Sequence, residues 1–277
     1  MPTQAIKKVL VVGGGGLPGF AWTLAALGEL RRRGFHLEEA DRVIGTSAGG
    51  IAAALLLSGI NMEEALASAS SQLSIPAKWI PWLTIYSTLG NQLLPGNPAF
   101  LSQIYRPSRN RGLEGWEGTL KGLTRGIMWP ANLELIATDP TRAKHRILMA
   151  RDGVPLHTAL AASSTVPGIF RPTDIEGHPY IDGGFRSVTN ADLVSTCDRV
   201  VAVSPRNHAL FPSRRAENQL RNSGADFALL RPALATALAM GAHPLRAGHA
   251  DLLMRDGVRV ARRRVEKCRE IWLVNSH

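Results

Sequence analysis

The run Gly45-Thr46-Ser47-Ala48-Gly49 constrains the fold of this chain more than any other segment. A short apolar strand is expected before it at 42–44, and an alanine-rich helix after it at 48–57. A strand that turns sharply into a helix holds its serine in a strained conformation, and the flanking glycines avoid a steric clash. Because a helix N-terminus also favours nearby negative charge, Ser47 is either an outward-pointing nucleophile or the cap of an ordinary tight turn.

The composition is that of a globular protein with a substantial core. The 277 residues are 45% hydrophobic, and we predict one α/β domain spanning 1–277 rather than two small ones. Cys197 and Cys268 are too few and too far apart for a disulfide framework or a zinc site, and they fit a reducing cytoplasm. The apolar run after Lys7-Lys8 is too short for an export signal, and no apolar stretch reaches the roughly 20 residues of a membrane span. We therefore predict a cytoplasmic protein.

Positive charge is concentrated towards the C-terminal end. The formal net charge is +10, and from Arg206 onward there are thirteen Arg and Lys residues against six Asp and Glu residues. A basic helical face can attract anionic lipid head groups or nucleic acid, and it can equally be a solvated surface. Because no aromatic interleaving or nucleic-acid module accompanies it, we predict no nucleic-acid partner. Peripheral contact between region 206–277 and an anionic membrane stays a hypothesis.

The first fifty residues are predicted to form one βαβ unit. Val9–Val12 is a continuous apolar run typical of a buried parallel strand. A helix is expected from Pro18 to Arg33, with proline in its first turn, and the strand that leads to Ser47 follows. Such a unit indicates a mainly parallel sheet with helices on its faces.

The glycine-rich segment Gly13–Gly19 has two interpretations. The spacing Gly14-x-Gly16-x-x-Gly19 matches a dinucleotide fingerprint, which would favour an NAD(P)-binding oxidoreductase. However, the second strand ends at Ser47 and not at the acidic residue that would hold the ribose. In the favoured interpretation, the glycines bring backbone N–H groups close to Ser47 and form an oxyanion hole, in which one donor is typically worth about 100-fold in rate.

The remainder of the chain is expected to continue the alternation of strands and helices. The further expected elements are a helix at 61–72, an apolar core or lid segment at 74–100, a surface excursion at 107–126, strands at 133–138, 146–149 and 199–204, a helix at 156–163, a mostly helical part at 213–267 and a last strand at 271–274. No repeat and no low-complexity segment interrupts this order.

A serine nucleophile needs a base to remove its proton. His208, His243 or His249 could complete a Ser-Asp-His triad, but none of them lies in a glycine-bounded turn at a strand end. Asp182 does lie at a predicted strand end, directly before two glycines, although Asp-Gly is also a common turn signal. An aspartate within about 2.6–3.2 Å of Ser47 can act as the base itself if burial keeps it basic.

Four segments in this order resemble the patatin-like phospholipase family. They are Gly13–Gly19, Gly45–Gly50, Ala162–Gly168 and Asp182–Gly184. The resemblance covers roughly residues 5–205, and region 206–277 carries no matching motif. It implies a three-layer α/β/α fold with a mainly parallel sheet, a serine lipid acyl hydrolase acting on lipid or acyl-ester substrates, and no metal or organic cofactor.

The resemblance also implies roles for individual residues. Ser47 matches the nucleophile of a Ser-Asp dyad and Asp182 its base. The oxyanion hole is implied at the amides of Gly14, Gly15 and Gly16.

This sequence departs from the family pattern in the glycine-rich loop. The loop of the family usually reads G-G-G-x-R/K-G, and Pro18 takes the basic place here. Proline has neither a positive charge nor a backbone donor. A catalytically weak or idle member of the same fold, binding a lipid or a partner, is therefore an alternative to an active hydrolase.

Overall fold

The computed structural model describes residues 7–60, 64, 115–142, 144–167, 169–196, 198–206, 215–242 and 250–273. The helix expected at 61–72 (apart from Glu64) and the apolar segment at 74–100 lie outside these residues. Within them, no helix combines the length and hydropathy that crossing a membrane requires.

The described residues form an eight-stranded sheet in the order β5-β6-β3-β2-β1-β7-β8, with β4 paired to β3. The parallel strands are β1 (Lys8–Val12), β2 (Arg42–Thr46), β3 (Leu133–Asp139), β7 (Arg199–Val203) and β8 (Asp226–Leu230). The antiparallel strands are β4 (Lys144–Leu148), β5 (Thr173–Ile175) and β6 (His178–Asp182). The predicted βαβ unit is confirmed, since β1 and β2 are adjacent and parallel.

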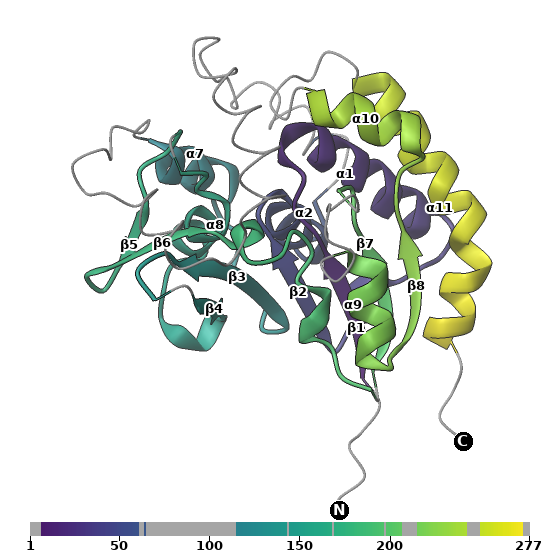
Figure 1. The fold of residues 1–277 in the computed structure, drawn as a ribbon, viewed down its shortest axis with the longest axis horizontal. Coiled ribbons are helices and arrows are strands. Elements are labelled where there is room, and N and C mark those ends of the chain that lie inside the picture. Colours follow the sequence, from purple (N-terminus) through teal and green to yellow (C-terminus); the bar gives the residue numbers. More distant parts are fainter. Residues whose placement is uncertain are drawn as a thin grey trace, which may run out of the picture.

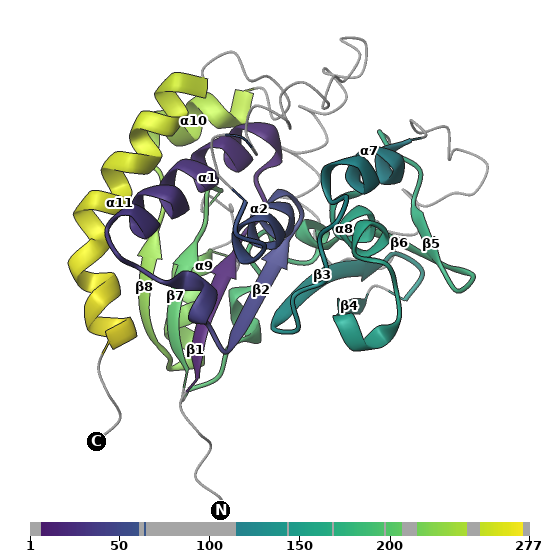
Figure 2. The same cartoon turned by 180° about the vertical axis from the view of Figure 1, so that it is seen from behind.

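Helices cover both faces of this sheet, as Figures 1 and 2 show from opposite sides. The helices are α1 (Gly16–Arg32), α2 (Ala48–Leu57), α7 (Trp116–Leu123), α8 (Leu156–Ser164), α9 (Ala216–Ser223), α10 (Leu234–Ala242) and α11 (Ala250–Leu273). Short 3₁₀ turns are η1 (Leu37–Glu39), η5 (Ala150–Asp152), η6 (Gly183–Phe185) and η7 (Ala191–Leu193). Helices α1, α2 and α11 lie on one face and α9 on the other, which gives three layers.

The strands are hydrophobic on both faces because each face contributes to a core. In β1, Leu10 and Val12 belong to the larger core with α1, α2, α8 and α11. Val9 and Val11 belong to a smaller core with α9 and η7. All four side chains are fully buried, as expected for a parallel strand covered on both sides.

Helices α1 and α11 approach closely although they are far apart in the sequence. Trp22 of α1 donates its indole N–H to Asp256 of α11 at 3.0 Å. A side chain on Gly257 would lie 2.5 Å from the Trp22 carbonyl oxygen, so only glycine permits this approach. The C-terminal helix is therefore part of the main core.

One expectation for secondary structure was wrong, and two others lacked an element. The part expected to be mostly helical does contain α9, α10 and most of α11, but its residues 226–230 form strand β8, which pairs with β7. The last strand expected at 271–274 is absent as far as Leu273, since α11 continues to that residue. Buried Ala261, Val265, Cys268 and Trp272 keep the three- and four-residue spacing of a helix. The surface excursion at 107–126 contains helix α7.

Candidate active site

Ser47 lies on a sharp turn between β2 and α2. Its backbone has φ 53° and ψ −130°, in the positive-φ region that residues other than glycine rarely adopt. Such a conformation costs about 1–3 kcal/mol and persists only where the surrounding fold enforces it. The Ser47 side chain makes no capping hydrogen bond to α2, so the interpretation as an ordinary cap is wrong.

The glycines around Ser47 are required by close backbone contacts. A methyl group on Gly49 would overlap the carbonyl oxygens of Val12 and Gly13 at the end of β1. A Cβ on Gly45 would lie 2.6 Å from the Cα of Gly50. The pattern G-x-S-x-G therefore lets the first turn of α2 pack directly on the sheet.

Replacing Gly49 by alanine is expected to lower the free energy of unfolding by about 3 kcal/mol, because the β1 carbonyl groups cannot move aside without disturbing the sheet. Gly118→Ala is the control, since Gly118 is exposed in helix α7 and no described atom lies within 4 Å of the added carbon. This control should stabilise the protein by about 0.5–1 kcal/mol. Urea unfolding measures both, and equal effects would contradict the packing argument.

Asp182 is the last residue of strand β6, and its side chain contacts that of Ser47. The Ser47 hydroxyl donates to Asp182 Oδ2 at 2.6 Å, and the Gly184 amide donates to Asp182 Oδ1 at 2.7 Å. Strand β6 pairs with β3, which in turn pairs with β2, and this topology brings together two residues 135 positions apart. Both side chains are buried, at 8% exposure for Ser47 and 6% for Asp182. The serine and the carboxylate predicted from the sequence are thus in direct contact.

The environment of Asp182 makes its carboxylate unusually basic. Burial raises the pKa of Asp182 to about 6, while the hydrogen bonds from Ser47 and Gly184 act in the opposite direction. An exposed aspartate has a pKa of about 3.9. Asp182 is therefore ionised at neutral pH yet holds a proton far more readily than a surface carboxylate, which suits a general base.

The glycine-rich loop passes beside Ser47, and one of its three candidate donor amides is already hydrogen-bonded within the fold. A Cβ on Gly14 would lie 3.1 Å from the Ser47 Cβ, so the loop is close to the serine. The Gly14 amide already donates to the Val188 carbonyl at 2.8 Å. The amides of Gly15 and Gly16, at the start of α1, have no acceptor among the described residues. Of the three predicted oxyanion donors, Gly15 and Gly16 are the two that remain available.

The segment Ala162–Gly168 fixes the backbone of both Ser47 and Asp182. Ser163 Oγ accepts from the Ser47 amide at 3.0 Å and donates to the carbonyl oxygen of Ile136 in β3 at 2.8 Å. The Thr165 carbonyl accepts from the Asp182 amide at 2.9 Å. The sequence shows this segment as a motif but does not indicate these roles for Ser163 and Thr165. The available signal was a cluster of small hydroxyl residues at a helix end, where such side chains bond to neighbouring backbone.

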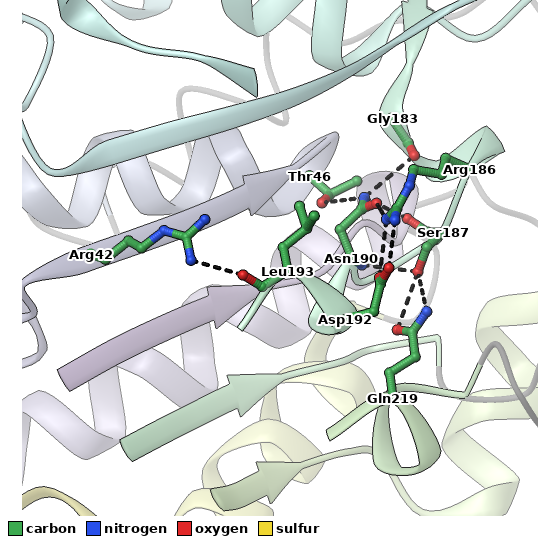
Figure 3. Close-up of polar contacts among 9 residues, drawn as sticks. All are labelled: Arg42, Thr46, Gly183, Arg186, Ser187, Asn190, Asp192, Leu193 and Gln219. Atoms are coloured by element: carbon green, nitrogen blue, oxygen red, sulfur yellow. Dashed lines mark hydrogen bonds and ion pairs between the residues drawn. The ribbon is translucent and has the colours of Figure 1, made fainter. Parts of the chain in front are cut away.

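Asn190 is a second positioning residue that the sequence analysis missed (Figure 3). Its side chain is fully buried, and its Nδ2 donates to Thr46 Oγ1 at 3.0 Å, to the Ser187 carbonyl at 2.7 Å and, more weakly, to the Gly183 carbonyl at 3.4 Å. Its Oδ1 accepts from Arg186 at 2.7 Å. Thr46 directly precedes the predicted nucleophile and Gly183 directly follows the predicted base. Asn190 therefore joins the two turns that carry the candidate site.

Replacing Asn190 by alanine is expected to lower kcat for ester hydrolysis by about 10–100-fold with little change in KM, because a small displacement of reacting groups is costly. Gln219→Ala is the control, since the Gln219 side chain hydrogen-bonds only to the Ser187 hydroxyl among the described residues, at the far edge of the same network (Figure 3). Its effect should stay within about threefold. Steady-state kinetics, run where circular dichroism shows both variants folded, measure the difference. Full activity in folded Asn190→Ala would contradict the positioning role.

The alternative Ser-Asp-His triad requires one of three histidines. His208, His243 and His249 lie outside the described residues. Among the residues that are described, no group of three or more His, Cys, Asp or Glu side chains could hold a metal ion. The Ser-Asp pair is the nucleophile and base combination that the described part of the chain brings together.

Comparison with known families identifies the class of this fold and site. The model of the patatin-like phospholipase family matches residues 10–195, about two thirds of the chain. The chain therefore belongs to the patatin-like phospholipase family, and at that level it is related to lipid hydrolases. The predicted three-layer α/β fold and the resemblance to this family are confirmed.

Individual relatives add detail at lower similarity. YqhO of Bacillus subtilis (strain 168) is 30% identical over an alignment of 203 residues. The match covers 64% of this chain and 63% of YqhO, so the chain spans less than two thirds of that relative. The crystal structure of VipD from Legionella pneumophila is similar with a TM-score of 0.52 at 12% identity, over 97% of this chain and 67% of that one, and supports the fold alone. ExoU of Pseudomonas aeruginosa, solved in complex with SpcU, is similar over 95% of this chain and 54% of that one. The identity is 16%, and the TM-score of 0.37 is too low to support the fold.

Proposed function

We propose that this protein is a serine acyl hydrolase that cleaves ester bonds in lipids with a Ser47-Asp182 dyad. The observation that carries the proposal is the 2.6 Å hydrogen bond from the Ser47 hydroxyl to a buried carboxylate, made at a strained strand-to-helix turn. Membership in a family of lipid hydrolases supports the same reaction class. In this proposal, residues 1–277 form one catalytic domain that hydrolyses lipids at their surfaces in the cytoplasm.

The proposed reaction has two halves. Ser47 Oγ attacks the ester carbonyl carbon while its proton moves to Asp182, and the amides of Gly15 and Gly16 bind the negatively charged oxygen of the tetrahedral intermediate. Protonated Asp182 then gives its proton to the leaving alcohol, the ester bond breaks and an acyl group stays on Ser47. A water molecule, deprotonated by Asp182, attacks this acyl group. Asp182 then returns the proton to Ser47 Oγ as the bond between this oxygen and the acyl group breaks, and the fatty acid is released.

Hydrolysis of a panel of ester lipids tests the proposed function. Fatty-acid release from phospholipids, mono- and triacylglycerols is measured with the wild-type protein and with Ser47→Ala. The proposal predicts release from at least one of these lipids by the wild-type protein only. Absence of release from every lipid by folded protein would favour the idle lipid- or partner-binding alternative, and a thermal shift with NAD(P) would favour the oxidoreductase.

A further inference from the structure

Exposed large hydrophobic side chains gather at one end of the molecule. Among the described residues, four such side chains are exposed, namely Met128 (88%), Leu234 (73%), Leu238 (66%) and Leu252 (54%). Three of them lie on α10 or on the first turn of α11. Leu234 and Leu238 are four residues apart and therefore share one face of α10. Such clustering on a protein surface indicates a binding site more often than single exposed leucines do.

A row of arginines runs along α11 beside these leucines. Arg255, Arg259 and Arg263 recur every four residues, so they lie on one side of the helix, where like charges repel. Arg259 forms an ion pair with Asp256. The side chains of Arg255 and Arg263 have neither a hydrogen bond nor an ion pair with any described residue. Two positive side chains without an ion-pair partner in the described part of the chain can bind an external anion.

Leu234 and two of these arginines, Arg259 and Arg263, line the same hollow. One hollow of about 410 Å³ lies between α10 and α11 and has Leu234 and Ala237 on one wall and Arg259, Arg263 and Arg264 on the other. A second hollow, of about 740 Å³, has Arg255, Arg259 and Arg263 in its wall, together with apolar Met254 and one acidic residue, Asp251. The two hollows share Arg259 and Arg263, so apolar side chains of α10 and α11 lie beside the same arginines.

Helix α10, with its exposed leucines, lies at the end of the molecule that carries the candidate active site. Helix α10 begins four residues after the end of β8, and Ser47 directly follows the end of β2. Because β8, β7, β1 and β2 are parallel, their C-terminal ends lie at the same edge of the sheet. Figures 1 and 2 show α10 at the end of the molecule opposite the end of α11.

We propose that Leu234, Leu238, Arg255, Arg259 and Arg263, here called the leucine–arginine surface, dock the protein on an anionic lipid bilayer. The two leucines enter the boundary between head groups and acyl chains, and the arginines bind the phosphate and carboxylate groups of the head groups. Docking in this way turns the edge of the sheet that carries Ser47 towards the lipid. The surface would thus supply the substrate for the proposed function, but binding itself does not depend on catalysis.

The chemistry of the surface favours a bilayer over other partners. A nucleic acid would satisfy the arginines but would leave the α10 leucines exposed to water. A second copy in a symmetric dimer would bring each arginine row against surface of the same composition, where like charges repel. A bilayer has an anionic layer directly above an apolar one, which matches arginines interleaved with leucines.

Sedimentation with lipid vesicles tests this proposal with full-length Ser47→Ala protein, so that binding is measured without hydrolysis. The vesicles contain phosphatidylcholine alone or phosphatidylcholine with phosphatidylserine. Binding to the anionic vesicles is expected, with at least about tenfold weaker binding to phosphatidylcholine alone. The pair Arg255→Gln and Arg263→Gln should weaken binding about 25-fold, roughly fivefold for each arginine. The pair Leu234→Ser and Leu238→Ser should weaken it about tenfold or more.

Matched variants elsewhere on the surface control for charge and hydrophobicity. Arg125→Gln with Arg151→Gln removes two exposed charges, and Met128→Ser removes the most exposed hydrophobic side chain. Binding by these controls should stay within about twofold of the parent protein. Equal losses in the controls, absence of vesicle binding, or tight binding to duplex DNA with the same arginine dependence would overturn the proposal. Hydrolysis of a water-soluble ester by the docking variants, made with Ser47 intact, should be unchanged, which separates failed docking from failed catalysis.

Discussion

Replacing Ser47 by alanine is expected to lower kcat/KM for a p-nitrophenyl ester by about 10⁴-fold or more, because no acyl-enzyme can form without the hydroxyl. The remaining rate would come from substrate binding and from the loop amides. A continuous absorbance assay of p-nitrophenol release measures the effect. The alanine variant should fold normally, since Ser47 Oγ donates to Asp182 alone and makes no capping bond.

Ser164→Ala is the matched control for this experiment. Ser164 is also buried and close in sequence to Ser163, but its hydroxyl donates to the Leu160 carbonyl and accepts from Trp116, away from the dyad. Its loss should change kcat/KM by less than about tenfold. Retention of more than about one hundredth of the wild-type rate in Ser47→Ala would contradict a serine nucleophile at this position.

Replacing Asp182 by asparagine is expected to lower kcat/KM by about 10³–10⁴-fold, because the amide keeps the shape of the carboxylate but cannot accept the serine proton. In the wild-type protein kcat/KM should rise with pH through about 6, the pKa of Asp182, and then level off as the basic form is fully populated. The asparagine variant should lose this rising limb. A similar loss of activity through His208, His243 or His249, with Asp182→Asn still active, would instead restore the triad alternative.

Asp182→Asn should raise the free energy of unfolding at neutral pH, although it lowers activity. Burial places the folded-state pKa of Asp182 above that of an exposed aspartate. The contribution of this carboxyl to the free energy of unfolding therefore falls as pH rises from about 4 to about 6, by on the order of 3 kcal/mol. Asp182→Asn removes this penalty, so the variant should become more stable than the wild type above about pH 6 while the two converge near pH 4. Urea unfolding at the two pH values measures the change.

The turn that carries Ser47 was predictable because its determinants are local. Two glycines, a short apolar strand and an alanine-rich run specify the strand-to-helix turn, and the predicted helix at 48–57 has the observed bounds of α2. The strand before it extends two residues beyond the expected end, to Thr46. The contact between Ser47 and Asp182 is different, because it depends on the antiparallel pairing of β6 with β3. The glycine-bounded strand end favoured Asp182 over the histidines as the base, and the resemblance to a family assigned it that role, but neither could give the distance between the two side chains.

Other features of the site could not be predicted because their causes are tertiary. The role of Asn190 arises from where its amide points after folding, towards Thr46 and Gly183. The Gly14 amide donates to the carbonyl of Val188, which is distant in the sequence. Strand β8 contains a four-residue apolar run, Phe227–Leu230, that suits either a strand or a buried helix, and only its neighbour β7 decides between them. Local pattern therefore specifies single turns, whereas the positions of donors and acceptors depend on the packed fold.

Labelling with a fluorophosphonate followed by peptide mass spectrometry tests the central claim, that Asp182 activates Ser47 as a nucleophile, most directly. If Asp182 activates Ser47, one covalent adduct forms on the peptide that contains Ser47 in the wild-type protein, and labelling is at least about 100-fold slower in Asp182→Asn. An adduct on another residue, no adduct on folded wild-type protein, or equal labelling rates in the two proteins would contradict it.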